Sequence, residues 1–429
     1  MITGFARHQD VLASGLRLVT VELPHLHSAS VVMYARVGSR YEDASDNGLS
    51  HFLEHMLFRG TARYPDAYRI NYAIEALGGT LYAETGRDYS LYQLSLHPET
   101  LAEGISLMGE IFTAPAFRDI DIERRILLEE LLEDLDEKGR VINVGDLARQ
   151  SAYPDHPLGY SITGPYANVE RFTLGDVQRH FERCYGARNM LLCVSGAVRR
   201  DEVRPQVERA FTGLRPGAEL HSATPPARPG GARFLHVPHT GTQTSVDMLF
   251  RALPESSPDY PALIALSRVL DDGMSTRLHH RVCDELGLAY YVSASLDSFS
   301  DASLFELDAS SAHANVPALV RESLALLDEL RTTPPSPAEL TKAKRRYRWD
   351  VEASFDDPDS MAGWFGGVEL YYPAPSFEEK IARMEAVTPE DVSRVARAIF
   401  TPEHLTVATV GQLDGAIVRE VKQLVTNFR

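Results

Sequence analysis

The feature that most constrains the fold of this chain is an internal repeat at a constant offset. The stretch Ser30-Val-Val-Met-Tyr-Ala-Arg36 recurs 215 residues later as Ser245-Val-Asp-Met-Leu-Phe-Arg251. The same offset relates four positions near the end of each half: Thr173, Asp176, Val177 and Arg179 correspond to Thr388, Asp391, Val392 and Arg394. Because the chain has 429 residues, about twice this offset, the repeat predicts two copies of one fold.

A segment rich in proline and glycine separates the two copies. Residues 215–231 include Arg-Pro-Gly and Thr-Pro-Pro-Ala-Arg-Pro-Gly-Gly, a composition typical of an exposed linker. We therefore predict an N-terminal domain at residues 1–214 and a homologous C-terminal domain at residues 232–429. Each part has an ordinary domain size.

The hydrophobic pattern of the first half predicts strands near both of its ends and helices between them. The predicted strands are Leu16–Val21, Ser30–Val37, Tyr89–Leu96 and Met190–Val194, and the predicted helices are Gly48–Phe58, Ala67–Leu77, Thr100–Phe112 and Asp121–Asp136. This order indicates an α+β sandwich and not a doubly wound parallel sheet.

Charge and composition limit the kinds of partner. The chain has 43 basic and 60 acidic side chains, and beyond the short run 342–346 it lacks the basic clusters that nucleic-acid binding requires, so we expect no nucleic-acid partner. Without a run of about 20 apolar residues or a secretory signal, we expect no membrane partner and a cytoplasmic location. Three widely spaced cysteines, Cys184, Cys193 and Cys283, predict neither a disulfide framework nor a cysteine-ligated metal.

One segment contains residues suited to binding a metal ion. It is His51-Phe-Leu-Glu54-His55, which lies within an otherwise apolar predicted helix capped by Asp46 or Asn47. Residues four apart share a helix face, so both imidazoles can bind one ion, with the Glu54 carboxylate close by. This set suits Zn²⁺ if a third ligand comes from elsewhere and the fourth position is left to water. The alternative is that the histidines are merely packed, but burying them without partners would cost on the order of several kcal/mol.

The third ligand is expected from the acidic helix predicted at Asp121–Asp136. Its leucines at positions 127, 128, 131, 132 and 135 predict the buried stripe. Glu123 and Glu130, seven residues apart, fall together on the edge of this stripe. We therefore predict Glu130 as a ligand and Glu123 as a supporting residue, and we assign Glu129 and Glu133 to a solvated face.

The zinc motif and its spacing resemble the pitrilysin-like metallopeptidases, an inverzincin family that includes insulysin and the mitochondrial processing peptidase. The motif is followed by 74 residues between His55 and Glu130. Similar phrases are Gly78-Gly-Thr80, His156-Pro-Leu-Gly159 and Gly287-Leu-Ala-Tyr290, so the resemblance extends over nearly the whole chain. It implies two similar α/β-sandwich domains, each with a mixed sheet and helices on one face.

The resemblance also implies an activity and the roles of individual residues. His51, His55 and Glu130 would hold a Zn²⁺ cofactor, with Glu54 as the general base and Glu123 steadying the catalytic site from behind. The implied function is a zinc-dependent endopeptidase that hydrolyses unfolded peptides enclosed in a chamber. The alternative is a non-catalytic scaffold or a substrate-binding subunit of a related complex.

Substrate binding is implied at an exposed sheet edge, where a peptide would add as a strand. The matching segment is Thr80–Thr85, with Tyr82 and Ala83 as substrate-binding residues. Members of the family usually carry Asn where this chain has Tyr82. Tyr290 in the second half matches a family tyrosine that also holds the substrate.

The second half departs from the zinc motif and from one further family residue. At the repeat offset the ligand and base positions become Leu266, Val269, Leu270 and Arg345, so this half is not expected to bind zinc. The family's Arg, seven residues before Tyr290, is Cys283, which cannot supply a guanidinium. We therefore predict a heterodimer with a related subunit that supplies the Arg/Tyr pair. The alternatives are a homodimer, or replacement by Arg281 or Arg277.

Overall fold

The computed structural model describes residues 4–226 and 230–429. Its internal contacts group the chain into two compact units. Unit 1 comprises the chain up to Leu131, Tyr160–Ser222 and Asp350–Phe377, and unit 2 comprises Leu132–Gly159, Ala223–Trp349 and the chain from Glu378 onward. Within the predicted linker, residues 227–229 lie outside the described residues, and the described remainder of 215–231 contains neither helix nor strand.

Unit 1 is built on a six-stranded mixed sheet. Its strands are β1 (Ala6–Val11), β2 (Arg17–Glu22), β3 (Ala29–Ala35), β4 (Thr80–Thr85), β5 (Ser90–Leu96) and β6 (Met190–Gly196). Their order is β1-β2-β6-β3-β5-β4, in which β2 and β6 are parallel and the other neighbours are antiparallel. This order makes β4 an edge strand.

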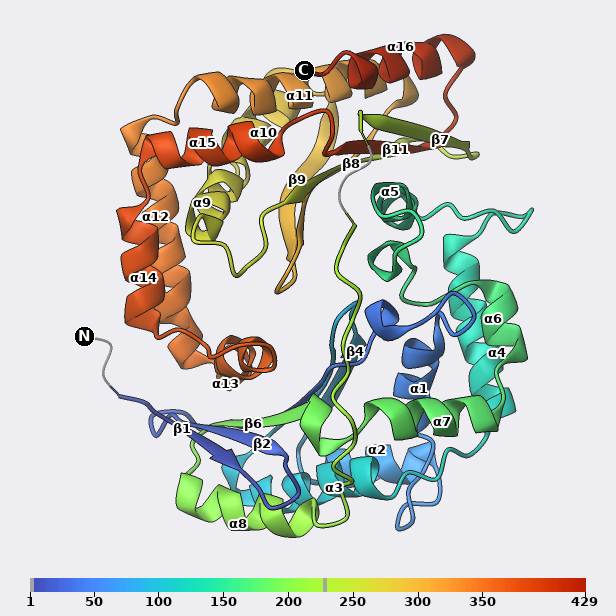
Figure 1. Ribbon diagram of the computed structural model, residues 1–429, viewed down its shortest axis with the longest axis vertical. Coiled ribbons are helices and arrows are strands. Elements are labelled where there is room, and N and C mark those ends of the chain that lie inside the picture. The colour runs from blue at the N-terminus through green and yellow to red at the C-terminus, as the bar shows by residue number, and fades with distance from the viewer. Residues whose placement is uncertain (1–3, 227–229) are drawn as a thin grey trace. The chain divides into compact units, whose positions relative to one another are not determined.

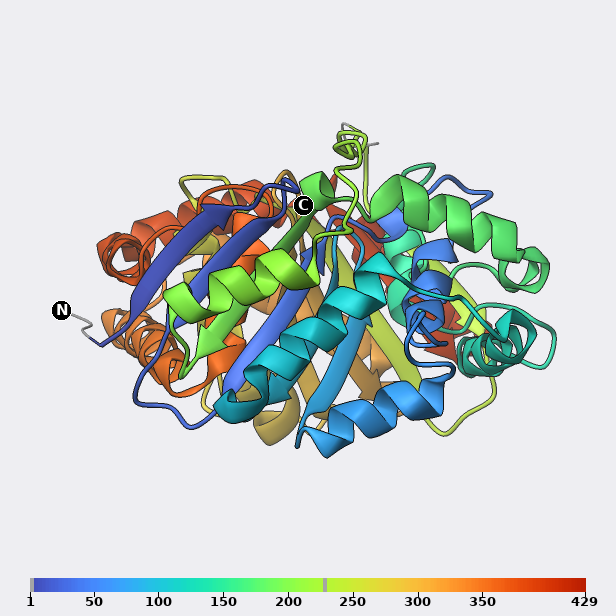
Figure 2. The ribbon, with the colours of Figure 1, turned by 90° about the horizontal axis from the view of Figure 1, so that it is seen from below.

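The helices of unit 1 cover the sheet and extend beyond it. They are α1 (Leu49–Leu57), α2 (Ala67–Ala76), α3 (Leu101–Thr113), α4 (Ile120–Leu131), α6 (Tyr166–Arg171), α7 (Leu174–Cys184), α8 (Arg200–Ala210) and α13 (Pro358–Ala362). Helices α2, α3 and α8 lie across one face of the sheet (Figure 2). Helix α1 packs against α4 and α7. Tyr92, Phe112 and Phe211 are among the buried side chains of the core.

Unit 2 repeats this architecture with five strands. They are β7 (Arg233–Pro238), β8 (Thr244–Ala252), β9 (Ala289–Ser298), β10 (Ser303–Ser311) and β11 (Leu405–Gly411), in the order β7-β11-β8-β10-β9. Its helices are α5 (Val144–Ala152), α9 (Tyr260–Leu270), α10 (Arg277–His279), α11 (Val316–Thr332), α12 (Pro337–Ala353, which runs on into unit 1), α14 (Phe377–Ala386), α15 (Pro389–Ile399) and α16 (Gly415–Thr426).

The repeat seen in the sequence is a repeat of structure. An offset of 215 maps β6 onto β11 and α7 onto α15 without a gap. The matched Thr and Asp residues are helix caps, because Thr173 with Asp176 and Thr388 with Asp391 each form a capping box, the reciprocal pair of side-chain and backbone hydrogen bonds that begins a helix. The predicted α+β fold with two similar domains is therefore confirmed.

The two units exchange equivalent segments of the chain. Residues 132–159 come from the first half but belong to unit 2, and residues 350–377 come from the second half but belong to unit 1. The repeat offset maps the first segment onto 347–374, so the exchange is nearly reciprocal. The chain therefore passes from one unit to the other at several points and not only at the linker.

The exchanged segments cover the sheet faces that the long helices leave open. In unit 1, α13 packs on β3 and β6, opposite α3 and α8 (Figure 1), and Ser95 donates a 3.0 Å hydrogen bond to Asp359. In unit 2, α5 packs on β8 and β11, opposite α11 and α16 (Figure 1). There Arg149 forms ion pairs with Glu306 at 2.6 Å and Asp297 at 3.3 Å. The sequence patterns did not predict that α13 and α5 would cover these sheet faces.

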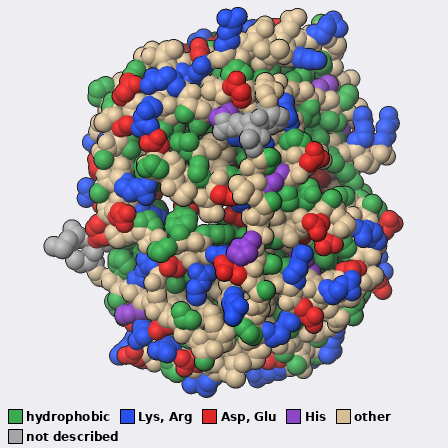
Figure 3. Space-filling view, viewed as in Figure 1, with side chains coloured by type: hydrophobic (Ala, Val, Ile, Leu, Met, Phe, Trp, Pro, Cys, Tyr) green, Lys and Arg blue, Asp and Glu red, His purple; other side chains and the backbone are tan. Residues whose placement is uncertain are grey.

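The surface mixes charges of both signs. On the face drawn in Figure 3, Lys and Arg side chains are interspersed with Asp and Glu.

The cysteines Cys184, Cys193 and Cys283 are free thiols, as expected. None of the helices in the described parts of the chain combines the length and the apolar character required to cross a bilayer.

Candidate active site

The site is built on α1, whose first turn is fixed from outside the helix. The N-cap is Gly48, with φ of 97°, and not Asp46 or Asn47 as expected. Its added Cβ would lie 2.6 Å from the Thr163 carbonyl oxygen, so a glycine is required here. The capping carboxylate comes from Glu42, which accepts hydrogen bonds from the backbone N–H groups of Gly48 at 2.9 Å and Ser50 at 2.6 Å.

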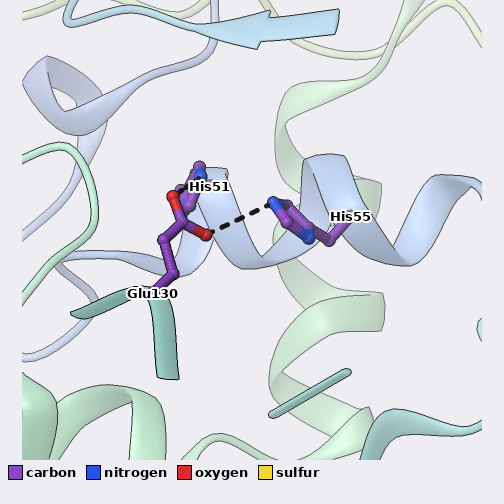
Figure 4. A group of neighbouring side chains, drawn as sticks. All are labelled: His51, His55 and Glu130. Atoms are coloured by element: carbon purple, nitrogen blue, oxygen red, sulfur yellow. Dashed lines mark ion pairs between the residues drawn. The ribbon is translucent and has the colours of Figure 1, made fainter. Parts of the chain in front are cut away.

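His51 and His55 project from one side of α1 toward the carboxylate of Glu130 (Figure 4). Nε2 of His51 lies 3.6 Å from Oε1 of Glu130, and Nε2 of His55 lies 3.9 Å from Oε2. One ligand atom from each of the three residues lies within 4.8 Å of the other two. Among residues 4–226 and 230–429, this is the one group of at least three His, Cys, Asp or Glu side chains close enough to hold a metal ion.

The donor set fits a zinc ion. Zn²⁺ bonds of roughly 2.0–2.2 Å in tetrahedral geometry place neighbouring ligand atoms about 3.4 Å apart, and the two imidazole–carboxylate separations, 3.6 and 3.9 Å, are slightly longer. Two imidazoles and one carboxylate are also the donors expected at a catalytic zinc site that leaves a position open. Small movements of the side chains would complete the coordination.

Helix α4 presents Glu130 and Glu123 to α1, as the seven-residue spacing predicted. The helix is shorter than expected, because it ends at Leu131 and is followed by a 3-10 turn at Leu132–Asp134. The predicted buried stripe is therefore only partly correct: Leu127 and Leu131 are buried, whereas Leu132 is half exposed. The chain leaves unit 1 at this point, so the leucines beyond it do not continue the packed face.

Glu123 lies behind the histidines and contacts one of them. Its Oε1 lies 2.7 Å from Nδ1 of His55, and its Oε2 accepts a hydrogen bond from Arg59. Burial alone would raise the pKa of Glu123, but these two partners outweigh it and lower the pKa. Glu123 is therefore a buried carboxylate, 4% exposed, that holds the His55 ring.

Glu54 receives a hydrogen bond that the sequence did not reveal. The hydroxyl of Thr85, at the end of β4, donates to Oε2 of Glu54 at 2.5 Å. Burial raises the pKa of Glu54, and the hydrogen bond from Thr85 and the charge of His55 offset part of that rise. A carboxyl group whose pKa is shifted toward neutrality is suited to accept and return a proton.

The two histidines differ in their electrostatic surroundings. Burial and then repulsion by His55 lower the pKa of His51 to about 3, so this imidazole is neutral at ordinary pH. Burial would lower the pKa of His55 as well, but the hydrogen bond to Glu123 and the nearby charge of Glu54 raise it. The neutral imidazole is the form that binds a metal.

The predicted substrate-binding residues lie on edge strands. Tyr82 and Ala83 are on β4, which in the described part of the chain pairs with β5 alone. The Tyr82 side chain is half exposed, and its hydroxyl donates to Glu84 at 2.9 Å. Tyr290, 95% exposed, is on the edge strand β9 of unit 2.

The counterpart of the metal-binding helix in unit 2 is apolar. Leu266, Val269 and Leu270 are buried on α9, and Arg345 lies exposed on α12. Cys283 is half-buried in a π-helical turn, His280–Glu285. The site geometry of unit 1 is therefore not repeated.

The two arginines near Cys283 already have carboxylate partners. Arg281 forms ion pairs with Glu322 at 2.8 Å and with Glu285 at 3.0 Å. Arg277 pairs with Glu339 at 2.6 Å and Glu329 at 3.3 Å. Either side chain would have to give up these partners to replace the missing arginine.

Sequence reasoning missed three residues that support the site. Arg59 lies four residues after His55 but beyond the end of α1 at Leu57, so the period of the helix does not place it beside His55. Thr85 and Glu42 lie outside the helices of the motif, and no local pattern in the sequence joins them to α1.

Two duplicated α+β units, with a helical His-x-x-Glu-His motif and a third carboxylate beside it, define a protein with the architecture of the inverzincins. Two protein-family models match this sequence. The family model described as insulinase (peptidase family M16) matches residues 17–166, and the one described as the peptidase M16 inactive domain matches residues 171–347. This chain belongs to peptidase family M16, the pitrilysin-like family, whose members include zinc proteases.

Curated relatives agree with this assignment over most of their length. An uncharacterised zinc protease of Streptomyces coelicolor is 29% identical over 403 residues, which cover 91% of this chain and 87% of the relative. A probable mitochondrial-processing peptidase subunit beta of Schizosaccharomyces pombe is 26% identical over 431 residues, covering 95% and 91%.

Solved structures show the same fold. A protease from Helicobacter pylori has a TM-score of 0.88 with 23% identity and covers 95% of this chain and 100% of its own. A peptidase M16 inactive domain from Pseudomonas fluorescens has a TM-score of 0.86 with 20% identity, covering 95% and 98%.

Proposed function

We propose that this protein is a zinc-dependent endopeptidase. The observation that carries the proposal is the convergence of His51, His55 and Glu130, with Glu54 on the same helix. Bound there, Zn²⁺ would polarise the scissile carbonyl group and lower the pKa of a water molecule. A protein that acted only as a scaffold would have no physical need for this complete set.

The chain's own residues would then perform the proton transfers. Glu54, whose pKa is raised by burial, accepts a proton from the attacking water and returns it to the departing amine. Thr85 holds one oxygen of Glu54, which keeps the carboxylate oriented. Glu123 fixes the ring of His55 through Nδ1, so that Nε2 is directed toward the metal position.

Peptides would bind along β4. Its free edge offers backbone N–H and C=O groups to an added strand, a mode that depends little on the peptide's sequence. Tyr82 and Ala83 lie on this strand, and we propose that they contact the substrate, with Tyr290 holding it from the second half. Binding as an added strand favours unfolded peptides as the substrate class, and these peptides would be enclosed while they are cleaved.

We further propose a related partner subunit that supplies an Arg/Tyr pair. Support comes from Cys283 at the arginine position and from the ion pairs that already occupy Arg277 and Arg281. Mixing the chain with a related subunit should raise peptide cleavage. If the chain alone cleaves as fast as any mixture, a homodimer is the better account.

The decisive experiment on the activity is Glu54→Gln. Zinc content by elemental analysis should stay at one ion per chain, because Glu54 is not a ligand, while peptide cleavage should fall by roughly 10²–10⁴-fold with loss of the general base. A wild-type chain that purifies without zinc and does not take it up would instead support the non-catalytic scaffold.

A further inference from the structure

His51 and His55 are held in different ways. The ring of His55 is fixed by the buried carboxylate of Glu123 at 2.7 Å. Among the described residues, no hydrogen-bonding side chain holds the ring of His51 in this manner; its polar neighbours are Glu130, at 3.6 Å, and the ring of His55, 4.9 Å away between ring centres. The position of the His51 ring therefore depends on the backbone of α1.

The backbone of His51 lies in the first turn of α1, which the helix's own hydrogen bonds stabilise less than they stabilise later turns. His51 is the third residue of α1, and the N–H groups of a first turn have no partner within the helix. A side chain at the N-cap usually accepts one of these hydrogen bonds, but the N-cap here is Gly48. Glu54 and His55 lie in the second turn, where the helix supplies its own hydrogen bonds.

Glu42 supplies the missing acceptor from outside the helix. Its two carboxylate oxygens accept hydrogen bonds from the backbone of Gly48 at 2.9 Å, the backbone of Ser50 at 2.6 Å and the side chain of Asn47 at 3.1 Å. Glu42 is only 2% exposed, and burial raises its pKa against the opposing effect of these hydrogen bonds. Burying a carboxyl group is costly, so its retention requires strong local compensation.

The surrounding contacts hold the same turn. Asn47 also donates to the carbonyl of Ser161 at 2.8 Å, and the side chain of Asn168 donates to the carbonyl of Asn47 at 3.0 Å. On the other side, Oγ of Ser50 lies 3.0 Å from Nε2 of the buried His180 on α7. Glu42 is thus the central acceptor of a hydrogen-bonded network that ends at the residue preceding His51.

We propose that Glu42 is a positioning residue for zinc, which holds His51 in place through the first turn of α1. The inference rests on the proposed zinc site. Because Glu42 acts through the backbone and touches neither the metal position nor Glu54, its loss should weaken zinc binding much more than the turnover of the zinc-loaded protein.

The test is the zinc dissociation constant of Glu42→Gln, measured by competition with a chromogenic chelator. Glutamine keeps the volume but replaces one acceptor oxygen with an NH₂ group that faces an N–H donor, so at least one capping bond is lost. We expect the constant to rise about tenfold to a hundredfold, as for other residues that orient metal ligands. At zinc concentrations well above the raised constant, kcat should return close to the wild-type value.

The matched control is Asp66→Asn. Asp66 caps α2 in the same unit by accepting from the backbone of Arg69 at 2.8 Å, but α2 carries no ligand. This variant should leave the zinc constant unchanged within about twofold. Equal constants for wild type and Glu42→Gln would overturn the proposal, as would a kcat that stays low when zinc is saturating.

If Glu42→Gln does not fold, Glu42→Asp carries the same test, since it keeps the charge and shortens the reach by one methylene group. Thermal unfolding of the metal-free proteins separates a general loss of stability from a loss of zinc affinity. A wild-type chain that fails to bind zinc would refute the proposed function itself, an outcome distinct from equal affinities in wild type and variant.

Discussion

Nδ1 of His55 and Oε1 of Glu123 lie 2.7 Å apart. This hydrogen bond places the proton of a neutral His55 on Nδ1 and leaves Nε2 as a free ligand directed toward Glu130, 3.9 Å away. A carboxylate behind a ligating histidine fixes both the tautomer and the ring orientation. Glu123 therefore influences the metal position without contacting it.

Glu123→Gln should lower zinc affinity about tenfold to a hundredfold, because the glutamine loses the charge that supports His55. Competition with a chelator measures this directly. Asp121→Asn is the control, since Asp121 lies exposed on the same helix. Equal losses in the two variants would point to the stability of α4 and not to His55.

Glu130→Gln should abolish tight zinc binding and activity, because an amide is a poor replacement for a charged ligand oxygen. Elemental analysis after dialysis measures the loss. The neighbouring Glu129→Gln should keep its zinc, since Glu129 is exposed and has no place in the ligand group. A Glu130→Gln protein that retained full zinc content would remove Glu130 from the ligand set.

Chelation of zinc should also destabilise the protein. A ligand that binds only the folded state at a hundred times its dissociation constant contributes about 2.7 kcal/mol, and this contribution disappears when the zinc is removed. Differential scanning calorimetry with and without a chelator should show a lower melting temperature, which added zinc restores. An unchanged melting temperature would contradict tight binding to the folded state.

Thr85→Val should move the acidic limb of the pH profile of kcat/KM to higher pH. The hydrogen bond from Thr85 favours the charged form of Glu54, so its removal raises the pKa of that carboxyl further. Glu54 acts as a base only when ionised, so a higher pH is then needed for activity. Thr113→Val, which loses a hydroxyl bonded within its own helix, should leave the profile unchanged.

Asp391→Asn should destabilise unit 2 in a pH-dependent way. The hydrogen bonds from Thr388 in the capping box and the adjacent guanidinium of Arg394 lower the pKa of Asp391 from 3.8 to about 2. Because the pKa is lower in the folded state, the stabilisation is full above pH 3.8 and is lost as the pH falls through about 2. Denaturant unfolding should show a loss of about 0.3–1 kcal/mol at pH 7 that shrinks in acid. In the double mutant Thr388→Val/Asp391→Asn, the loss of unfolding free energy should be smaller than the sum of the two single losses, because both residues form the same capping box.

The sequence predicted those parts of the site that follow from helical periodicity. The spacing of four between His51 and His55, and of seven between Glu123 and Glu130, placed each pair on one helix face, and the structure brings His51, His55 and Glu130 together. Periodicity also predicted the principal strands and helices of unit 1, since their apolar residues face a single core.

Contacts between distant segments could not be read in this way. Glu42 reaches α1 from a preceding turn, and Thr85 reaches Glu54 from the end of a strand, so neither follows from the period of a helix or strand. The end of α4 at Leu131 was missed because the leucine pattern continues beyond it, although the chain there enters the other unit.

Because residues 132–159 and 350–377 are exchanged between the units, we expect that neither half of the chain folds on its own. A polypeptide that stopped at the linker would lack α13 over β3 and β6 and would carry α5 without its sheet. Co-expression of the two halves should therefore yield a soluble complex, whereas either half alone would expose an uncovered sheet face. In this protein, duplication made each copy a structural component of the other.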